Sequence, residues 1–567
     1  MLYKMNEIVH ELEVILGPGT AELGLRLGVH SGPVTAGVLR GEKSRFQLFG
    51  DTVNTAARME STGERNKIQV SQKTAELLIA AGKGEWIKPR DSLVVAKGKG
   101  KLQTFWLSPR TRSTGSQSGS HTNSTSFLEQ DISSNTGIDE VVPVVSKIED
   151  RVVAANQNLV NWYVDFLQTL LKKVLATRVD PTLTEALVTT VEGLAIENQS
   201  GKTLLEEMEE FVVLPDQPTA MLRDPESFDL SPIVLGQLRD YVSTIAQLYR
   251  NKPFHCFAHA THAGQSVAKL LSQMVKSESI DLGGLCYKKT RCRQMLHDTT
   301  YGIATDPLVL FACAFSALIH DVDHSGVTNS QLVKEGSNMA VLYKNRCVSE
   351  QNSIDVAWEL LMEPNYKELR ACIYSNPSEL HRFRQLVLHA VLATDDGDNE
   401  LEAERKRLWA EAFQGSAPSV ESAPGSTRDE GSANANSNAN ANANANLKAT
   451  LVIERMIQAS DFAFAMQHWH VYVKWNEMLF DEAYMSYMDG RAEINPSENW
   501  YEQELEFFDT FIIPLAQNLK DCSVFGVVID ECVDYAEANK IEWSLKGKEM
   551  IEKYMSKHKQ QANTSNG

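Results

Sequence analysis

The chain has 567 residues, of which 43% are hydrophobic and 23% are charged, and its formal net charge is -19. This length exceeds what one hydrophobic core usually organises, so we expect two folded units joined by linkers. The acidic balance excludes a broad electrostatic interface with nucleic acid, because the nucleic-acid phosphates would be repelled, although small anions could still bind at local metal or lysine sites.

Cysteine use and hydropathy favour a cytoplasmic chain. The eight cysteines fall between Cys256 and Cys532 with no CxxC pair, so neither a disulfide framework nor a zinc knuckle is predicted. The longest apolar run, residues 307–319, is shorter than the ~20 residues that span a bilayer, and the first residues lack the pattern of a signal peptide. We therefore expect no membrane insertion by this chain.

Residues 1–107 have the pattern of an α/β domain. Residues 23–29 alternate as a strand does, the Gly-Pro pair at Gly32 indicates a turn, and residues 52–61 have helical spacing. Residues 108–144 are rich in Ser, Thr, Gly and Asn, which predicts a flexible linker between two domains.

From residue 145 to residue 557 the pattern is helical. Apolar residues recur at three and four positions over residues 148–174 and 182–213, which predicts a helix in each. The apolar run at 307–319 predicts a buried helix. Residues 558–567 form a polar tail.

Imidazole and carboxylate groups gather in two places. His255 and His259 stand four apart, which on a helix puts both rings on one face, although an isolated pair of this kind is more often solvated. Two carboxylates and two imidazoles fall within residues 320–324, at the end of the apolar run, where buried charge is costly unless it is paired or metal-bound. A simple buried pair of His320 and Asp321 does not readily explain this density. The pattern favours a metal site, in which a bridging carboxylate could hold a second cation.

The order and spacing of these motifs resemble the class I 3′,5′-cyclic-nucleotide phosphodiesterases, whose catalytic domain is all-helical and of HD type. The resemblance implies a catalytic core at about residues 235–520. It implies that His255 is the general acid that protonates the O3′ leaving group. The metal ligands that it implies are His259, His320, Asp321 and Asp461, with Asp321 bridging two cations.

Further site residues follow from the same resemblance. His324 and Glu350 match groups that orient water at the metals, and Thr394 with Asp395 matches a pocket-lining segment. A polar stretch at residues 415–446 ends in an Ala-Asn alternation that cannot bury a core, and composition alone would make it a domain boundary. Because implied ligands lie on both sides of it, we expect a disordered insertion within the catalytic domain.

Several positions depart from the family pattern. Cys256 stands where the family usually has Asn, and His262 stands where it has Asp. Asn352 and Ser353 replace paired histidines, and Phe464 replaces a frequent Asn. None of these changes removes an implied ligand or the general acid, so they bear on purine recognition and not on hydrolysis.

Base recognition is expected at the last core helix. Ten residues before Pro514, where the family has a glutamine, this chain has Glu504, and Phe507 matches the purine-stacking phenylalanine. Plain core packing of Phe507 is an equal alternative, and Gln503 could replace its neighbour. An ionised glutamate only accepts hydrogen bonds, so we predict a modest preference for cyclic GMP over cyclic AMP.

Residues 25–37 and 48–60 look like class III nucleotidyl cyclases, which implies a ferredoxin-like α/β fold. In that family the positions of Asn54 and Arg58 orient ribose and stabilise transition-state charge. The basic run at residues 97–101 resembles a phosphate-contacting segment and could equally be a solvated turn.

The resemblance leaves out the first half of the cyclase domain, with its two metal-binding aspartates, and Gln47 matches neither usual choice at the base-selecting position. We therefore expect residues 1–107 to be a partial cyclase domain that is inactive alone, as the C-terminal piece of a receptor-type cyclase–phosphodiesterase fusion whose membrane anchor would lie upstream of Met1. Its partner would be the missing cyclase half, or a second copy if the segment only dimerises.

The expected activity is metal-dependent hydrolysis of 3′,5′-cyclic nucleotides to 5′-nucleoside monophosphates. The resemblance implies two divalent cations, Zn²⁺ at the tighter site and Mg²⁺ or Mn²⁺ at the second, which activate water for in-line attack on phosphorus. Two alternatives stay open: another HD-type phosphohydrolase, such as a nucleotidase, and a regulatory module that binds cyclic nucleotide without turnover.

Overall fold

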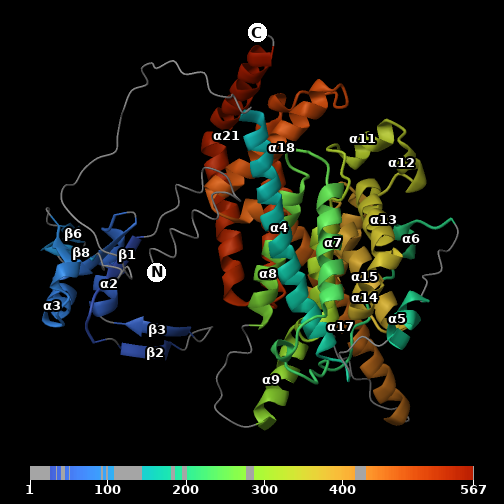
Figure 1. Ribbon diagram of the computed structural model, residues 1–567, viewed down its shortest axis with the longest axis horizontal. Helices are drawn as coiled ribbons and strands as arrows, with labels where there is room; N and C mark the ends of the chain where they lie inside the picture. The colour runs from blue at the N-terminus through green and yellow to red at the C-terminus, as the bar shows by residue number, and fades with distance from the viewer. Residues whose placement is uncertain are drawn as a thin grey trace, which may run out of the picture. The chain divides into compact units, whose positions relative to one another are not determined.

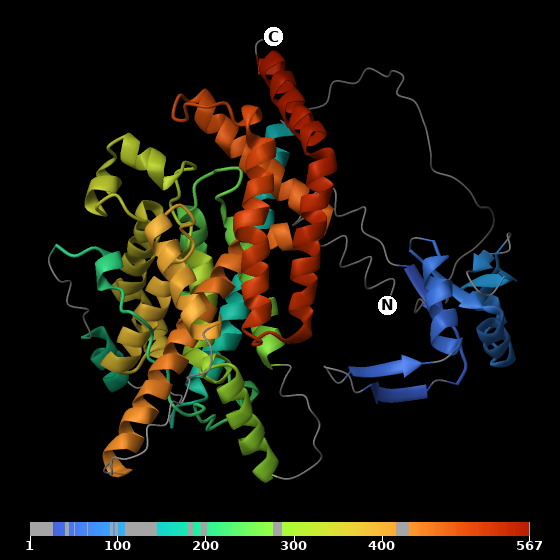
Figure 2. The same ribbon diagram turned by 180° about the vertical axis from the view of Figure 1, so that it is seen from behind.

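The computed structural model describes residues 26–33, 35–39, 45–49, 51–64, 66–90, 94–96, 100–107, 144–179, 185–193, 201–275, 286–414 and 430–565. The chain divides into two compact units, Met1–Ala155 and Asn156–Gly567. Strands occur in the first unit and the second is helical (Figures 1 and 2), which confirms the expected α/β region followed by a helical domain.

A four-stranded sheet in the order β1-β4-β8-β5 forms the centre of the N-terminal unit. Its first two strands are parallel, and α2 supplies the crossover that parallel pairing requires, while β8 is antiparallel to both of its neighbours. α2 packs so closely on β1 that a Cβ at Gly28 would lie 2.1 Å from the backbone N of Glu60, which only glycine avoids. The strands are β1 (Arg26–Val29), β2 (Thr35–Leu39), β3 (Arg45–Phe49), β4 (Lys67–Ser71), β5 (Ile87–Pro89), β6 (Val94–Ala96), β7 (Gly100–Leu102) and β8 (Thr104–Leu107). The helices are α2 (Asp51–Ser61), α3 (Gln72–Ala80) and the 3₁₀ turn η2 (Gly84–Trp86).

Helices make up the rest of the described chain. The α-helices are α4 (Val144–Leu175), α5 (Glu185–Glu192), α6 (Leu204–Glu207), α7 (Pro232–Leu248), α8 (Phe257–Val275), α9 (Cys286–Thr299), α10 (Pro307–Ile319), α11 (Asn329–Lys334), α12 (Asn338–Leu342), α13 (Val348–Met362), α14 (Lys367–Ile373), α15 (Pro377–Leu392), α16 (Asn399–Trp409), α17 (Glu430–Asp461), α18 (Trp469–Met488), α19 (Trp500–Phe507), α20 (Ile513–Asp521) and α21 (Asp530–Ser565). Shorter 3₁₀ turns are η3 (Pro225–Ser227), η5 (Ile303–Thr305), η6 (Pro364–Tyr366), η8 (Ala463–Met466), η9 (Pro496–Glu498) and η11 (Gly526–Ile529), and π-helical turns are η7 (Ala410–Gln414) and η10 (Phe508–Ile512).

α10 is the central helix of the second unit. Every one of its residues is buried, and α8, α13, α15 and α17 pack against it, as expected for a helix that is apolar on all sides. Its start is capped by Asp306, whose Oδ1 accepts from the backbone N–H of Leu308 at 3.0 Å. The predicted buried helix is confirmed, and its C-terminal end places His320 in the protein interior and Asp321 in a partly buried position beside it.

The sequence prediction of one helix over residues 182–213 was wrong. The structure has the short helices α5 and α6 there, and residues 194–200 lie outside the described part. α6 starts at a capping box in which Thr203 and Glu206 bond reciprocally, two residues after Gly201, whose φ of +93° interrupts a helix. The helix predicted over residues 148–174 is present as α4.

The expectation of a disordered stretch at residues 415–446 was wrong for its second part. Residues from Glu430 onward form the first turns of α17, because alanine has the highest helix propensity and alternates with asparagine here. Two of these asparagines also make hydrogen bonds to the segment before α7. Asn446 Oδ1 accepts from the backbone N–H of Leu214 at 3.0 Å, and Asn442 Nδ2 donates to Asp216 Oδ1 at 3.1 Å. Residues 415–429 lie outside the described residues.

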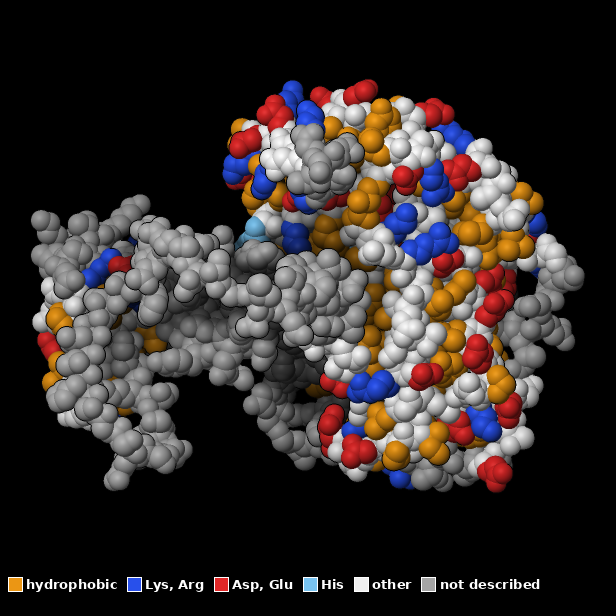
Figure 3. Space-filling view, turned by 45° about the horizontal axis from the view of Figure 1, so that its top comes forward, with side chains coloured by type: hydrophobic (Ala, Val, Ile, Leu, Met, Phe, Trp, Pro, Cys, Tyr) orange, Lys and Arg blue, Asp and Glu red, His pale blue; other side chains and the backbone are white. Residues whose placement is uncertain are grey.

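Over the described residues, none of the helices has both the length and the apolar character required to cross a membrane. On the face shown in Figure 3, acidic and basic side chains alternate over the described surface of the helical unit, with apolar side chains between them. Such a mixture is typical of a solvated protein surface.

Candidate metal centre

His320 and Asp321 follow the last residue of the central helix. The Nδ1–H of His320 donates to the carbonyl oxygen of Ala317 at 3.2 Å, because a carbonyl can only accept. This bond keeps a proton on Nδ1, so the neutral ring would present a lone pair at Nε2, the form in which imidazole binds metals. His320 is only 2% exposed, and its Nε2 faces the carboxylates of Asp321 and Asp461.

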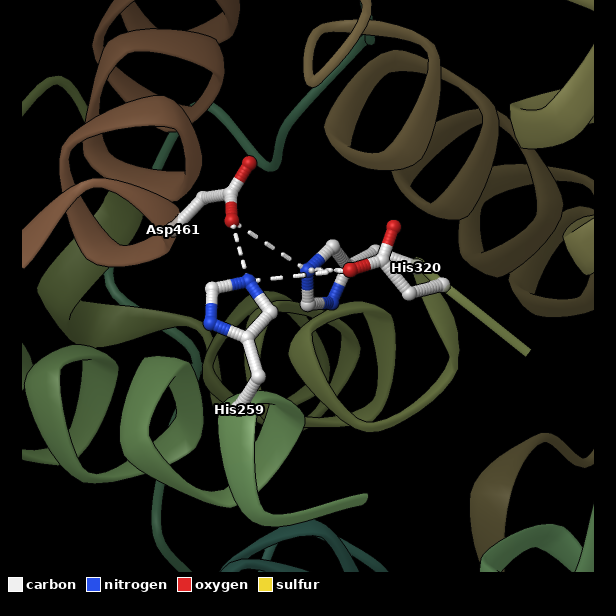
Figure 4. A group of neighbouring side chains, drawn as sticks. His259, His320 and Asp461 are labelled. Carbon is white, nitrogen blue, oxygen red and sulfur yellow. Dashed lines mark hydrogen bonds and ion pairs between the residues drawn. The ribbon is translucent and has the colours of Figure 1, made fainter. Parts of the chain in front are cut away.

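The four predicted ligands come together from three helices (Figure 4). His259 lies in the first turn of α8, and Asp461 is the last residue of α17. His259 Nε2 lies 2.7 Å from Asp461 Oδ1 and 3.6 Å from Asp321 Oδ2, while His320 Nε2 lies 3.1 Å from Asp321 Oδ2 and 3.4 Å from Asp461 Oδ1. All four ligand atoms lie within 4.8 Å of one another.

The electrostatics of this cluster fit a cation. Burial by itself lowers the pKa of His320, but the carboxylates of Asp321 and Asp461 outweigh it and raise that pKa well above its usual value. The two carboxylates thus require a positive charge between them, which a divalent metal would supply. Two imidazole nitrogens and two carboxylate oxygens are a donor set suited to zinc, and the remaining oxygen of Asp321 would be available to a second cation.

The structure corrects the expectation that His255 and His259 share a helix face. α8 begins at Phe257, so His255 lies in the turn before the helix, and the two rings are 6.3 Å apart at an interplanar angle of 75°. Glu482 holds this turn, because its Oε2 accepts from the backbone N–H groups of Phe254 at 3.0 Å and His255 at 3.1 Å.

Glu482 is also the partner of the His255 imidazole, through Nδ1. Burial opposes protonation of His255, but the charges of Glu482 and Asp321 outweigh it and raise the pKa of His255 to about 9. The ring of His324 lies 3.7 Å from that of His255, and burial followed by the charge on His255 lowers the pKa of His324 to about 3. The pair therefore consists of one protonated and one neutral imidazole at neutral pH.

Sequence reasoning missed Glu482, which lies on α18, 227 residues from its partner. No local motif marks it, and only the packing of α18 against the turn before α8 reveals its role. His324 lies with His255 and Glu482, and the role predicted for it, to orient water at the metals, stays a prediction.

Glu350 and Asp395 belong to a second cluster of polar side chains, in which Asn329 joins them by hydrogen bonds. The side-chain amide of Asn329 donates to Glu350 Oε2 at 2.8 Å and to Asp395 Oδ2 at 3.0 Å, and its Oδ1 accepts from Ser349 N at 2.9 Å. Burial, followed by the charge of Asp395, raises the pKa of Glu350 to about 8. Asn329 was not identified from the sequence. The hydroxyl of Thr394, which the sequence did indicate, donates within its own turn to the carbonyl oxygen of Val391.

Glu504 lies inside the helical packing. Its Oε2 accepts from the hydroxyl of Tyr472 at 2.6 Å, and burial raises its pKa to about 7, so the carboxyl group is only partly ionised at neutral pH. The predicted preference for cyclic GMP stays a prediction. Phe507 stacks on Phe511 with ring centroids 5.3 Å apart and meets the edge of Phe462 at 5.3 Å. Phe462 directly follows Asp461 in the sequence, and the contact of Phe507 with the base stays a prediction.

The predicted cyclase residues lie on α2 and in the strands beside it. Arg58 is partly exposed in the last turn of α2. The side chains of Asn54 and Gln47, and residues 97–99 of the basic run, lie outside the described residues.

Comparison with known proteins gives two family matches. Residues 254–530 match the family model of 3'5'-cyclic nucleotide phosphodiesterases, and residues 2–109 match that of the adenylate and guanylate cyclase catalytic domain. These assignments agree with the two resemblances seen in the sequence.

Individual relatives are similar to this chain only in part. Guanylate cyclase 32E of Drosophila melanogaster is 45% identical over 104 residues, which is 18% of this chain and 9% of the relative. Human atrial natriuretic peptide receptor 2 is 51% identical over 86 residues, 15% of this chain and 8% of the receptor. The chain thus spans less than a tenth of the length of these curated relatives. Among solved structures, the phosphodiesterase domain of the RhoPDE fusion protein from the choanoflagellate Salpingoeca rosetta is 18% identical, covers 56% of this chain and 85% of that chain, and has a TM-score of 0.39.

Proposed function

Since residues 254–530 form a domain of the 3'5'-cyclic nucleotide phosphodiesterase family, we propose that this chain hydrolyses 3′,5′-cyclic nucleotides to 5′-nucleoside monophosphates. The observation that carries the proposal is the convergence of two imidazoles and two carboxylates, within 4.8 Å of one another, beside a separate imidazole whose pKa is raised to about 9. A module that only binds the nucleotide would not need an acid poised to protonate a leaving group.

We assign the metal ligands as His259, His320, Asp321 and Asp461. Two divalent cations held there, Zn²⁺ at the four-ligand position and Mg²⁺ or Mn²⁺ beside Asp321, would polarise the phosphate and lower the pKa of the attacking water. Asn329, Glu350 and Asp395 form a hydrogen-bonded set that can orient water near the cations.

His255 is the general acid in this proposal. Glu482 occupies its Nδ1, so Nε2 carries the proton that can reach the departing O3′ when the bond from phosphorus to O3′ breaks. Glu482 also stabilises the imidazolium before transfer, which keeps the acid charged at neutral pH. The histidine becomes neutral in this step and regains a proton from solvent before the next turnover.

The N-terminal segment is proposed to lack cyclase activity by itself. Residues 1–50 contain no aspartate that could bind a catalytic metal in this segment. The segment would act as a dimerisation module or would complete a site with another cyclase half. A cytoplasmic setting is proposed for the chain, since the structure has free thiols at Cys256, Cys292, Cys313, Cys347, Cys372, Cys522 and Cys532.

The test is an assay of the purified chain with cyclic AMP and with cyclic GMP, measuring the 5′-monophosphate formed. Activity should require metal and should be lost in His255→Ala by roughly 10²–10⁴-fold, as expected for loss of a general acid. His381→Ala is a suitable control, because that exposed histidine pairs only with Glu209 on the surface. Full activity after exhaustive removal of metal would refute the proposal.

A further inference from the structure

One buried side chain, Gln458, ties the last turn of α17 to the C-terminal end of α15. Gln458 is 0% exposed, and its Nε2 donates to the carbonyl oxygen of Ala393 at 2.8 Å. Ala393 directly precedes Thr394 and Asp395. The other end of the amide, Oε1, accepts from Nη1 of Arg455 at 2.8 Å. Both polar ends of the side chain are therefore used.

Arg455 extends this connection to α16. Its guanidinium is buried, and Nη1 lies 3.1 Å from each carboxylate oxygen of Glu402. α16 and α17 stand on either side of residues 415–429 in the sequence, so this ion pair joins the two helices that flank that stretch. Breaking a buried ion pair leaves an uncompensated charge, which is strongly unfavourable. The pair with Glu402 therefore keeps the Arg455 guanidinium in the position from which it donates to Gln458.

The contact of α17 with its neighbours is partly apolar, through Val452, Ile453 and Met456, and partly polar. Glu454 Oε1 pairs with His389 Nδ1 on α15 at 2.7 Å, and its Oε2 accepts from Arg405 on α16 at 3.2 Å, but both bonds lie two turns before Asp461. Gln458 makes its bond to α15 one turn from Asp461, at the carbonyl that precedes Thr394 and Asp395. Asp461 lies one turn beyond Gln458, at the end of the same helix. A shift of α17 along its axis would therefore move the carboxylate of Asp461 relative to the segment that carries Thr394 and Asp395.

We infer that Gln458 is a positioning residue of the metal centre. Its bond to Ala393 fixes the position of the end of α17, and therefore of Asp461, relative to the segment that carries Thr394 and Asp395. Arg455, which is paired with Glu402, holds the other end of the Gln458 amide in place. This inference rests on the proposed metal-dependent hydrolysis. Residues that hold metal ligands in place through hydrogen bonds typically change metal affinity by about 10–100-fold when they are replaced.

The test uses the full-length chain and the variant Gln458→Met, which keeps the length of the side chain and removes both hydrogen bonds. Ser460→Ala is the matched control: Ser460 is equally buried and stands beside Asp461, but its hydroxyl bonds only within α17, to the carbonyl of Met456 at 2.8 Å. Zinc content is measured by elemental analysis after dialysis against graded chelator, and thermal unfolding is measured on the chelated proteins.

We expect Gln458→Met to lose zinc at a free zinc concentration roughly 10–100-fold higher than wild type, while Ser460→Ala retains zinc as wild type does. Gln458→Glu differs by one heavy atom. Its carboxylate, measured well above the pH at which it is protonated, can accept from Arg455 but has no hydrogen to donate to Ala393, so it should lose zinc as the methionine variant does. This second variant keeps the inference testable if the methionine variant does not fold.

Unchanged zinc retention in both Gln458 variants, with only a lower melting temperature, would overturn the inference and leave Gln458 a structural residue. Zinc loss of equal size in Ser460→Ala would overturn it as well, because the effect would then follow from any change near Asp461. A wild-type protein that holds no divalent metal would instead refute the proposed function.

Discussion

Glu482→Gln isolates the electrostatic role of the His255 partner. The amide oxygen of glutamine can still accept from the backbone N–H groups of Phe254 and His255, so the turn before α8 should keep its shape. Two things change beside the imidazole: the negative charge is lost, and the amide nitrogen that replaces Oε1 can donate to Nδ1 of a neutral His255 but cannot accept from it. Both changes lower the pKa of His255. In the wild type, the charge of Glu482 and the charge of Asp321 hold the pKa of His255 at about 9 against the effect of burial.

The magnitude follows from Coulomb's law. Unit charges about 4 Å apart interact by roughly 4 kcal/mol at an effective dielectric constant of about 20, which corresponds to about three pKa units. Neutralising Glu482 should therefore return the pKa of His255 to its ordinary value of about 6.5 or lower. The protonated fraction at pH 8 would then fall by about 30-fold for a pKa of about 6.5 and by about 90-fold for a pKa of about 6, whereas at pH 6 about half or more of the imidazole would stay charged in both proteins.

The assay is the pH profile of kcat/KM with metal saturating. A cation at Asp321 would cancel the contribution of that carboxylate in both proteins, so the test is the displacement between the two profiles. The basic limb of Glu482→Gln should move toward lower pH by about two units or more, with little loss at pH 6. Glu477→Gln is the control, since Glu477 lies on the same helix and pairs with Lys557. An unshifted limb in Glu482→Gln would refute the assignment of His255 as a general acid held protonated by Glu482.

Four further predictions concern the ligands, the polar stretch, the base and the N-terminal segment. Asp461→Ala should reduce activity and zinc content as severely as Asp321→Ala, and a mild effect in elemental analysis and assay would show that Asp461 is not a ligand. Deleting residues 416–429 should leave turnover within about twofold, because the entropy of closing a chain segment depends only weakly on its length, and a loss of folding by circular dichroism would contradict this. Glu504→Gln should weaken any preference for cyclic GMP. In the wild type that preference should also weaken below about pH 7, where the carboxyl group becomes protonated. Identical kinetics for both nucleotides before and after the substitution would show that Glu504 does not contact the base. The pure chain should form no cyclic nucleotide from ATP or GTP, even with manganese, and detectable product by chromatography would refute this.

The sequence by itself predicted the part of the site whose residues are close together in the chain. The apolar run before His320 predicted a buried helix, because a helix that is hydrophobic on every side must lie in the interior. The charged groups that follow it could only be stable there as a paired or metal-bound set. The family resemblance added Asp461 as the distant ligand, and the structure brings all four ligand atoms together.

Only the tertiary structure decided how these groups are held. The placement of His255 in a turn, with Glu482 as its partner, depends on how α18 packs against a segment 227 residues away, and no periodicity records such a contact. The same is true of Asn329 between two carboxylates and of Gln458 between two helices. Sequence periodicity reports which face of an element is buried, whereas hydrogen bonds between elements depend on the register in which those faces meet.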